Sequence, residues 1–171
     1  RRFGKSTNFD MLSCFLDIRK KETSEKLFEG LKIEGERLNN EKPCMDFRGK
    51  YPVVYMNFKK LGQDNYEKFH NAFKELISDL YLKHDYLLEG GILKNTEKTI
   101  FEKIMNKQDD GAYDFSLEKL MGYLHRHFGE RVFVLIDEYD TPFQQAIHQK
   151  LKPEQTNKVD YFDSLKSLMG T

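Results

Sequence analysis

The sequence predicts a three-layer α/β fold, in which helices cover both faces of a parallel sheet. Three observations predict it: a Gly4-Lys5-Ser6 tripeptide stands directly before a helical pattern, an unbroken apolar run at 131–138 ends in two carboxylates, and strand and helix patterns alternate between the two. A continuous apolar run is typical of a parallel strand that is buried on both faces. With 171 residues the chain fits one domain, which we assign to residues 1–171.

The chain begins with a motif for phosphate binding. Gly-Lys-Ser forms the second half of a loop whose backbone N–H groups surround a phosphate, while the lysine contacts the outer phosphates and the hydroxyl binds Mg²⁺. Gly4, Lys5, Ser6 and Thr7 are therefore the candidate nucleotide-binding residues, and Ser6 is also a candidate Mg²⁺ ligand. The first glycine of the full motif would precede Arg1, so we expect the chain to be a fragment that starts within the loop.

The segment after the loop predicts a helix, which turns polar at 19–21. Because this helix is apolar on nearly all sides, we expect it to lie between the sheet and a further layer. Its apolar residues are Phe9, Met11, Leu12, Cys14, Phe15, Leu16 and Ile18. Residues 22–50 have a mixed composition and predict short helices and irregular chain around one compact apolar segment, 27–33.

The first strand is predicted at 52–58, where β-branched and aromatic residues follow Pro52. An amphipathic helix comes next, and we expect it to begin at Asp64, with Glu67 completing a capping box. Its apolar face consists of Tyr66, Phe69, His70, Phe73, Leu76, Ile77 and Leu80.

Two further helices are predicted before the second strand, at about 96–106 and at 117–128, the latter ended by Gly129. The second strand is the apolar run at 131–138, and Thr141-Pro142 prevents its continuation. A last helix is predicted after Pro153, with an apolar face of Val159, Phe162, Leu165 and Met169.

The second strand supplies the other half of the candidate site. Ligands of α/β sheets bind beyond the carboxyl ends of the strands, where Asp137 can hold Mg²⁺ and Glu138 can orient or deprotonate a water molecule. Together with the N-terminal tripeptide, this strand indicates a P-loop NTPase that uses ATP and Mg²⁺, with Lys5 and Glu138 as catalytic residues. Tyr139 and Asp140 fit either a contact with substrate or partner or a plain turn at the strand end.

Composition excludes several other classes. The 28 basic and 28 acidic residues cancel, so no footprint for nucleic acid is visible, and no apolar run is long enough to cross a membrane. Cys14 and Cys44 lack metal-ligand spacing and predict reduced thiols in a cytoplasmic protein. His125 and His127 do not predict a metal site, because residues i and i+2 of a helix face different directions.

Four segments in order resemble the AAA-ATPase-like family. Its members carry an R-P-R-R-F-G-K-S loop, an L-F-x-G-L-x-I segment, a P-V-I/V strand and an L-I-D-E-Y-D motif. Residues 1–6, 27–33, 51–55 and 134–140 match these motifs, so the resemblance spans nearly the whole chain. It implies an ATP-binding domain, often followed by a nuclease-like domain or linked to a partner.

The resemblance assigns the same residues to phosphate, Mg²⁺ and water, and it adds the paired arginines Arg1 and Arg2. These arginines fit a phosphate or partner contact and a solvated basic turn equally well. No Asp or Glu in the chain is followed two positions later by Lys, so a nuclease centre must lie outside these residues.

Two functions stay open at this point. One is ATP hydrolysis that drives a conformational change in an attached domain or partner. The other is a catalytically weak or inactive interaction module that responds to nucleotide and scaffolds a neighbouring domain. The non-standard loop, which in the family lacks the usual first glycine, favours this alternative, and the intact Asp137-Glu138 pair argues against it.

Overall fold

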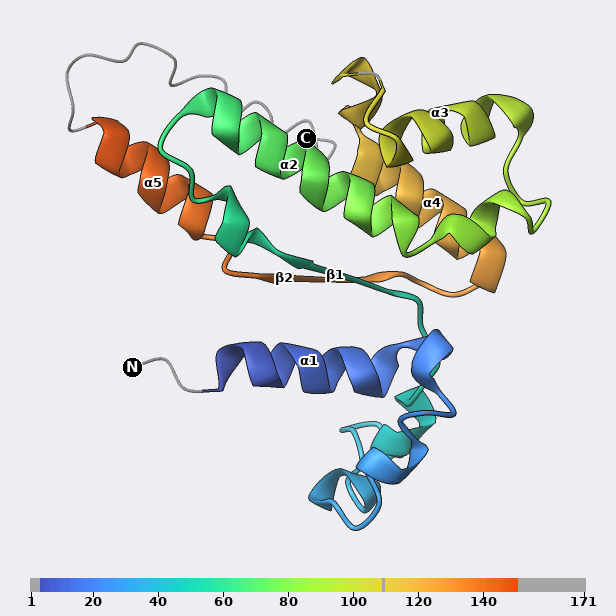
Figure 1. Cartoon of the computed structure of the whole chain (residues 1–171). Helices are drawn as coiled ribbons and strands as arrows, with labels where there is room; N and C mark the ends of the chain where they lie inside the picture. The colour runs from blue at the N-terminus through green and yellow to red at the C-terminus, as the bar shows by residue number, and fades with distance from the viewer. Residues whose placement is uncertain (1–3, 109, 151–171) are drawn as a thin grey trace.

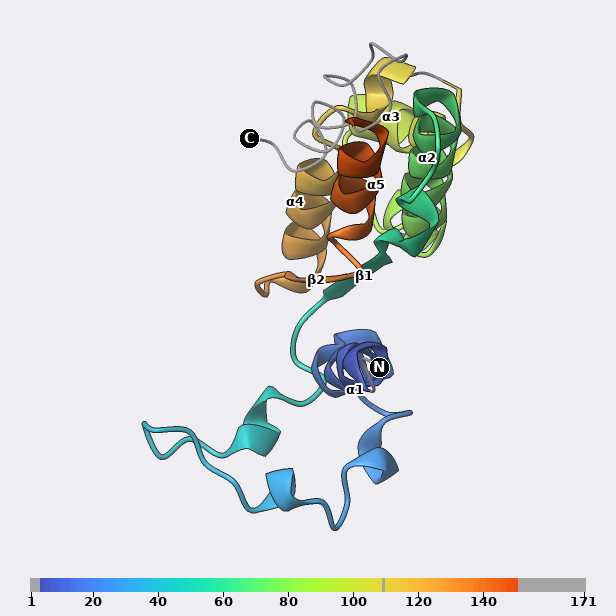
Figure 2. The same cartoon turned by 90° about the vertical axis from the view of Figure 1, so that its left-hand side faces the viewer.

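The computed structural model describes residues 4–108 and 110–150, and these form a parallel sheet between two helical layers. The sheet consists of β1 (Val53–Asn57) and β2 (Phe133–Asp137). Helix α1 (Lys5–Leu16) lies on one face, and α2 (Tyr66–Leu82), α3 (Asn95–Met105), α4 (Ser116–Phe128) and α5 (Thr141–Lys150) lie on the other side (Figures 1 and 2). The predicted α/β class, with helices on both sides of a parallel sheet, is confirmed.

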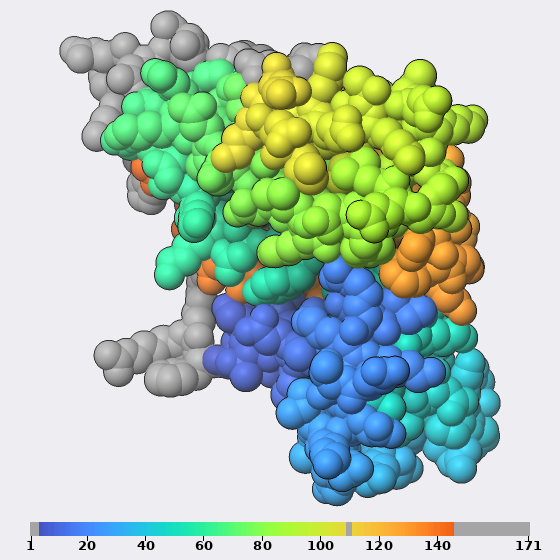
Figure 3. Space-filling model, turned by 45° about the vertical axis from the view of Figure 1, so that its right-hand side comes forward, coloured from blue at the N-terminus to red at the C-terminus, as the bar shows by residue number. Residues whose placement is uncertain are grey.

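Short 3₁₀ helices fill most of the connections in the described chain. They occupy Ile18–Lys20, Glu25–Leu27, Lys32–Glu34, Cys44–Phe47, Phe58–Leu61, Asp85–Leu88 and Asp110–Tyr113. The irregular character predicted for 22–50 is therefore confirmed. Figure 3 shows this segment, in blue to cyan, as a lobe below the layer formed by α2 and α3.

The register of the two strands sets which side chains share a face. Val53 lies beside Phe133 and Asn57 beside Asp137. Because strand residues alternate between faces, Val54 and Met56 point toward the α2 side, whereas Val53 and Leu135 point toward α1. The side chains of Asn57 and Asp137 point toward the same α1 side, and both residues end their strands at the edge of the sheet that lies above the start of α1.

Because side chains alternate between the two faces of each strand, the sheet divides the interior into two hydrophobic cores. The upper core is built on β1 and on the helices α2, α3 and α4, with Phe69, Ile77, Phe101, Leu120 and Leu124 among its fully buried residues. The lower core is smaller and consists of Phe15, Leu16, Phe28, Val53 and Leu135. The lower core fixes α1 against the sheet and thereby positions its N-terminus.

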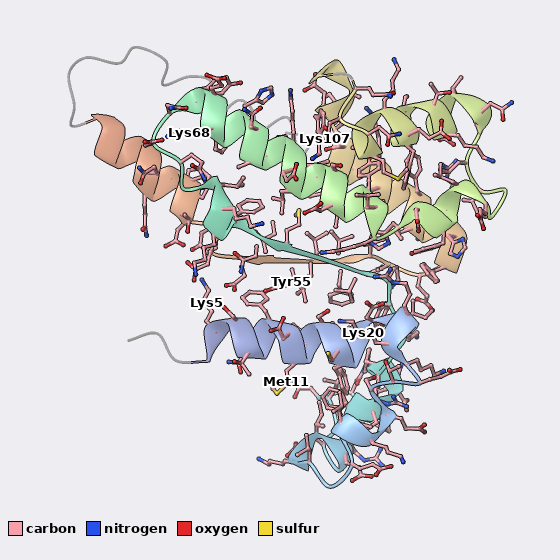
Figure 4. The ribbon with its side chains drawn as sticks, viewed as in Figure 1. Lys5, Met11, Lys20, Tyr55, Lys68 and Lys107 are labelled. Carbon is pink, nitrogen blue, oxygen red and sulfur yellow. The ribbon has the colours of Figure 1, made fainter. Side chains whose placement is uncertain are left out.

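One expectation for α1 is wrong. Met11 is 53% exposed and Leu12 42% exposed, so within the described residues no layer covers the far side of this helix. Figure 4 shows Met11 pointing away from the sheet. The apolar composition predicted a helix buried all round, but only the side that carries Phe15 and Leu16 packs on the strands.

The apolar segment 27–33 forms a core contact at a single buried residue. Phe28 packs edge-to-face on Phe15, with ring centroids 5.0 Å apart, whereas Leu27 and Leu31 are exposed. Ile33 is half-buried against the lower core. The compact cluster that the sequence predicted is thus only partly formed.

Three features of the elements differ from the predictions. Helix α2 begins one residue later than expected because Asn65 is its N-cap: the Asn65 side chain accepts the backbone N–H of Lys68 at 2.9 Å, and Asp64 instead accepts the Lys68 ammonium. Strand β2 is not buried throughout, because Phe133 at its start is exposed.

The third difference is α5, a helix that the sequence analysis did not predict at 141–150. Strand β2 ends at Asp137, before the turn at Glu138, and Pro142 lies instead in the first turn of α5, where its missing N–H has no partner to lose. The helix predicted after Pro153 lies outside the described residues. Gly129 ends α4 as predicted, with the left-handed φ of 70° that glycine tolerates best.

Candidate functional site

The site is built from the first turn of α1. Gly4 is its N-cap with φ 91°, a conformation that strains other residues, and a Cβ there would have no atom within 4 Å. In this described turn no side chain caps the helix and no acidic residue is present. The N-terminal N–H groups and the positive end of the helix dipole are therefore available to an anion.

Ser6 and Asp137 join this turn to the end of β2. The Ser6 hydroxyl donates to Asp137 Oδ2 at 2.6 Å, although 131 positions separate the two residues. Asp137 is fully buried, whereas Ser6 is exposed, so the contact lies at the boundary between the interior and solvent. A hydroxyl and a carboxylate at this distance supply two oxygen ligands of the kind that Mg²⁺ prefers.

Two more donors hold the Asp137 carboxylate. The backbone N–H of Glu138 donates to Oδ1 at 3.0 Å, and Asn57 Nδ2 donates to Oδ2 at 3.3 Å. Because these donors come from both strand ends, the carboxylate has a fixed orientation toward α1. Asn57 in turn is oriented through its Oδ1 atom, which accepts the N–H of Lys59 at 2.9 Å.

Asn57 is the site residue that the sequence analysis missed. The sequence analysis placed it only within the strand predicted at 52–58. The signal that could have found it is the parallel register: Asn57 ends β1 as Asp137 ends β2, and the carboxyl ends of parallel strands meet at one edge.

Lys5 lies at the same edge with a partly exposed side chain. Its ammonium is 3.9 Å from Asp137 Oδ1 and 5.5 Å from the centroid of the Tyr139 ring. The side chain is 36% exposed. Figure 4 shows Lys5 rising from the first turn of α1 toward the sheet.

Glu138 has an unusual backbone conformation. Its φ is 54°, a left-handed value that costs a non-glycine residue about 1 kcal/mol or more. The Glu138 backbone makes two hydrogen bonds in this turn: its N–H donates to the Asp137 side chain, and its carbonyl accepts the N–H of Thr141 at 3.1 Å. Strain at a half-buried carboxylate beside a nucleotide motif is typical of functional residues.

Tyr55 belongs to β1, and its side chain lies between the sheet and α1 (Figure 4). Burial raises the pKa of its hydroxyl, the hydrogen bond from Asn57 lowers it, and the negative charges of Asp10 and Asp137 raise it further. The hydroxyl therefore stays protonated at neutral pH and remains able to donate a hydrogen bond.

The remaining sequence-predicted residues lie apart from Asp137 or outside the described part of the chain. Thr7 is exposed in the first turn of α1, and Arg1 and Arg2 lie outside the described residues. His125 contacts the Glu130 carbonyl, and His127 packs on Phe128. Cys14 and Cys44 are free thiols.

Within the described ranges 4–108 and 110–150, no group of three or more His, Cys, Asp or Glu residues could hold a metal ion. A Mg²⁺ ion bound with a nucleotide needs only one or two carboxylates, because phosphates and water complete its shell. In the same ranges no helix has the length and apolar character needed to cross a bilayer.

Fold and site together define an α/β protein with a lysine, a hydroxyl and a carboxylate gathered at the carboxyl edge of its parallel sheet. The model of the AAA-ATPase-like family, described as a predicted AAA-ATPase, matches residues 1–170, and the chain belongs to this family. Membership indicates an ATP-related function. No curated protein and no solved structure matches the chain.

Proposed function

We propose that this protein is a P-loop NTPase that binds ATP with Mg²⁺ between the first turn of α1 and the ends of β1 and β2, and hydrolyses it. The observation that carries the proposal is the 2.6 Å hydrogen bond between Ser6 and Asp137. It joins the two halves of the nucleotide motif, which are 131 positions apart in the sequence.

The first turn of α1 has the properties of a phosphate site. Gly4 permits close approach of an anion, the turn has no acidic residue, and Lys5 supplies a positive charge. Backbone N–H groups at a helix N-terminus bind phosphate through hydrogen bonds and the helix dipole. Gly4, Lys5, Ser6 and Thr7 are the residues that we assign to the phosphates.

Ser6 and Asp137 fit the requirements of Mg²⁺ bound with a nucleotide. Both oxygens are hard ligands, and Asp137 is oriented by Asn57 and Glu138 before any ion binds. When bound, Mg²⁺ neutralises charge that develops on the phosphate oxygens. The Ser6 hydroxyl keeps its lone pairs while its proton is donated to Asp137, so its oxygen could ligate Mg²⁺ without the loss of that hydrogen bond.

Glu138 and Lys5 carry the reaction in this proposal. A water oxygen bonds to the γ-phosphorus while the bond from phosphorus to the β,γ-bridging oxygen breaks, and the water proton passes to the Glu138 carboxylate. Lys5 stabilises the negative charge on the phosphate oxygens. Positioning and electrostatic stabilisation account for most of the rate in such reactions.

Hydrolysis in this scheme drives a conformational change in an attached domain, such as a nuclease-like one, or in a protein partner. The family membership motivates this part of the proposal, together with the absence of a nuclease sequence motif in the chain. A cytoplasmic location with reduced thiols is part of the same proposal.

Substitution of Glu138 by Gln tests the proposed reaction. Glutamine keeps the size of the side chain and removes the base, so single-turnover hydrolysis should fall by about 10²–10⁴-fold while ATP affinity changes little. The measurement uses the full-length protein, with Glu102→Gln on the exposed side of α3 as the matched control. Glu102→Gln should hydrolyse ATP at the parent rate.

Two results contradict the proposal. If Glu138→Gln and the parent hydrolyse ATP equally fast, Glu138 has no catalytic role. If the full-length parent binds ATP without turning it over, the protein is an interaction module that responds to nucleotide.

A further inference from the structure

We propose that Tyr139 is a positioning residue for Lys5: its aromatic ring holds the lysine ammonium near Asp137, at the edge of the sheet where the phosphates of ATP would bind. This inference rests on the proposed function. It gives a role to a tyrosine that the sequence analysis left open between a functional contact and a plain turn.

Asp137 attracts Lys5 but does not orient it. The distance from Lys5 Nζ to Asp137 Oδ1 is 3.9 Å, which is longer than a hydrogen bond. Both carboxylate oxygens already accept shorter bonds, Oδ1 from the Glu138 N–H and Oδ2 from the Ser6 hydroxyl. The ammonium therefore feels the charge of Asp137 without a directional contact that would fix its position.

The Tyr139 ring provides a second attraction. The Lys5 ammonium is 5.5 Å from the ring centroid, within the range of a cation–π interaction. Tyr139 itself is 59% exposed, so burial contributes little to holding its ring there. The left-handed turn at Glu138 precedes it directly, and this turn determines the direction in which the chain and the ring leave β2.

Positioning matters because a lysine side chain has many rotamers. A long, partly exposed side chain loses conformational freedom when it binds phosphate, and a contact that already restricts it lowers this cost. The ring also leaves the ammonium accessible, since aromatic carbon does not compete with phosphate for its hydrogen bonds. We expect the contact to raise ATP affinity about two- to fivefold, the range for an exposed cation–π pair.

The first experiment compares two substitutions by calorimetric titration of the full-length protein with Mg²⁺-ATP. Tyr139→Leu removes the ring and should weaken ATP binding about two- to fivefold, and Tyr139→Phe keeps the ring and should recover most of the loss. In a Lys5→Met background the Tyr139→Leu substitution should have no further effect, because the cation is gone.

The second experiment detects the contact without nucleotide. An aromatic ring shifts the NMR signals of protons near its face, so the ε-CH₂ protons of Lys5 should resonate upfield in the parent and in Tyr139→Phe and return toward the ordinary lysine position in Tyr139→Leu. The Lys5 signal is assigned by its disappearance in Lys5→Met.

The outcomes separate the two proposals. If the parent does not bind ATP, the proposed function is wrong and this role falls with it. If the parent binds ATP and Tyr139→Leu binds it equally well or more tightly, or if Tyr139→Phe is as weak as Tyr139→Leu, only the role of the ring is wrong. An unshifted Lys5 signal in the parent also overturns the contact itself.

Discussion

Asp137 is a fully buried carboxylate that accepts hydrogen bonds from Ser6, Asn57 and the Glu138 backbone and lies near the Lys5 ammonium. A buried charge is costly unless such partners compensate for its lost hydration. The surrounding residues therefore compensate for the burial of the Asp137 carboxylate and aim it at the start of α1, which is the orientation that a metal ligand needs.

Substitution of Asp137 by Asn should remove most of the Mg²⁺ enhancement of ATP binding. The amide keeps the shape of the carboxylate but not its charge, whereas the N–H groups of α1 remain available to phosphate. ATP titrations with and without Mg²⁺ measure the effect, and Asp79→Asn on the exposed side of α2 is the control. An Asp137→Asn protein with the same Mg²⁺ enhancement as the parent would remove this residue from the metal site.

His84 is a buried titratable residue far from the nucleotide site in sequence. Burial, reinforced by the positive charges of Arg19 and Lys83, lowers the pKa of His84 to about 3. Its Nδ1 atom lies 3.0 Å from the Tyr86 hydroxyl. The folded protein thus keeps this histidine neutral, while the unfolded chain protonates it below its ordinary pKa of about 6.5.

This difference in pKa predicts the pH dependence of stability. The unfolded state binds the extra proton, so the stabilisation is complete above about pH 6.5 and is lost progressively as the pH falls from 6.5 toward 3. Between pH 6.5 and 5.5 the parent should lose about 1 kcal/mol more of its free energy of unfolding than His84→Gln, which does not titrate. Urea denaturation at both pH values measures this, and equal losses in the two proteins would show that burial does not hold His84 neutral.

At the scale of elements, the connection from β2 to α5 carries Glu138 and Tyr139. The helix α5 that follows it packs against the 3₁₀ helix Phe58–Leu61 and against Gly62. A Cβ on Gly62 would lie 2.6 Å from Thr141 Cγ2. Thr141 begins α5, and its N–H donates to the Glu138 carbonyl. Close packing at Gly62 therefore fixes the position of the turn that holds the proposed catalytic residue.

Substitution of Gly62 by Ala should destabilise the protein by about 1–3 kcal/mol and lower ATP turnover, because the added methyl displaces Thr141. Adding Thr141→Ser, which removes the Cγ2 methyl, should restore both properties. Thermal denaturation and hydrolysis assays measure the two effects. Gly122→Ala on α4 is the matched control, since a Cβ there meets no atom within 4 Å and alanine favours the helix; equal behaviour of the two alanine variants would contradict the packing argument.

At the scale of the whole molecule, the nucleotide site joins the two sides of the sheet. Lys5 and Ser6 belong to the α1 side of the sheet, and Asp137 belongs to the strand that also supports the upper core. At the far end of α1, Arg19 donates to the Lys83 carbonyl at 2.9 Å and links the same two sides. A ligand that binds both α1 and β2 should therefore stabilise the complete fold.

Mg²⁺-ATP at about 100 times its dissociation constant should stabilise the folded state by about 2.7 kcal/mol, or on the order of 5–10 °C in Tm. Lys5→Ala removes a charge-assisted phosphate contact worth about 1.5–3 kcal/mol, which lowers affinity by about one to two orders of magnitude. The same ATP concentration should then give less than about half of the parent's free-energy stabilisation. Thermal melts with and without Mg²⁺-ATP test this, and an unchanged Tm shift in Lys5→Ala would exclude Lys5 from the phosphate site.

The sequence by itself determined the main elements and half of the candidate site. The periodicity of apolar residues located α2, α3, α4 and both strands, and Gly129 gave the end of α4, because these features depend on neighbours a few positions away. The order of motifs predicted that Ser6 and Asp137 belong to one site, and the structure places their side chains 2.6 Å apart. The roles of Lys5, Thr7 and Glu138 in catalysis or binding stay predictions.

Only the tertiary structure decided which side chains meet. The register of β1 on β2 brought Asn57 to Asp137, the turn at Glu138 set Tyr139 beside Lys5, and packing on one side alone left Met11 exposed. None of these is a local property of the sequence, because each depends on how segments about 80 to 130 positions apart lie against one another or on which face of a helix receives a neighbour. Local periodicity determines that a strand or helix forms, whereas long-range packing determines what each of its faces contacts.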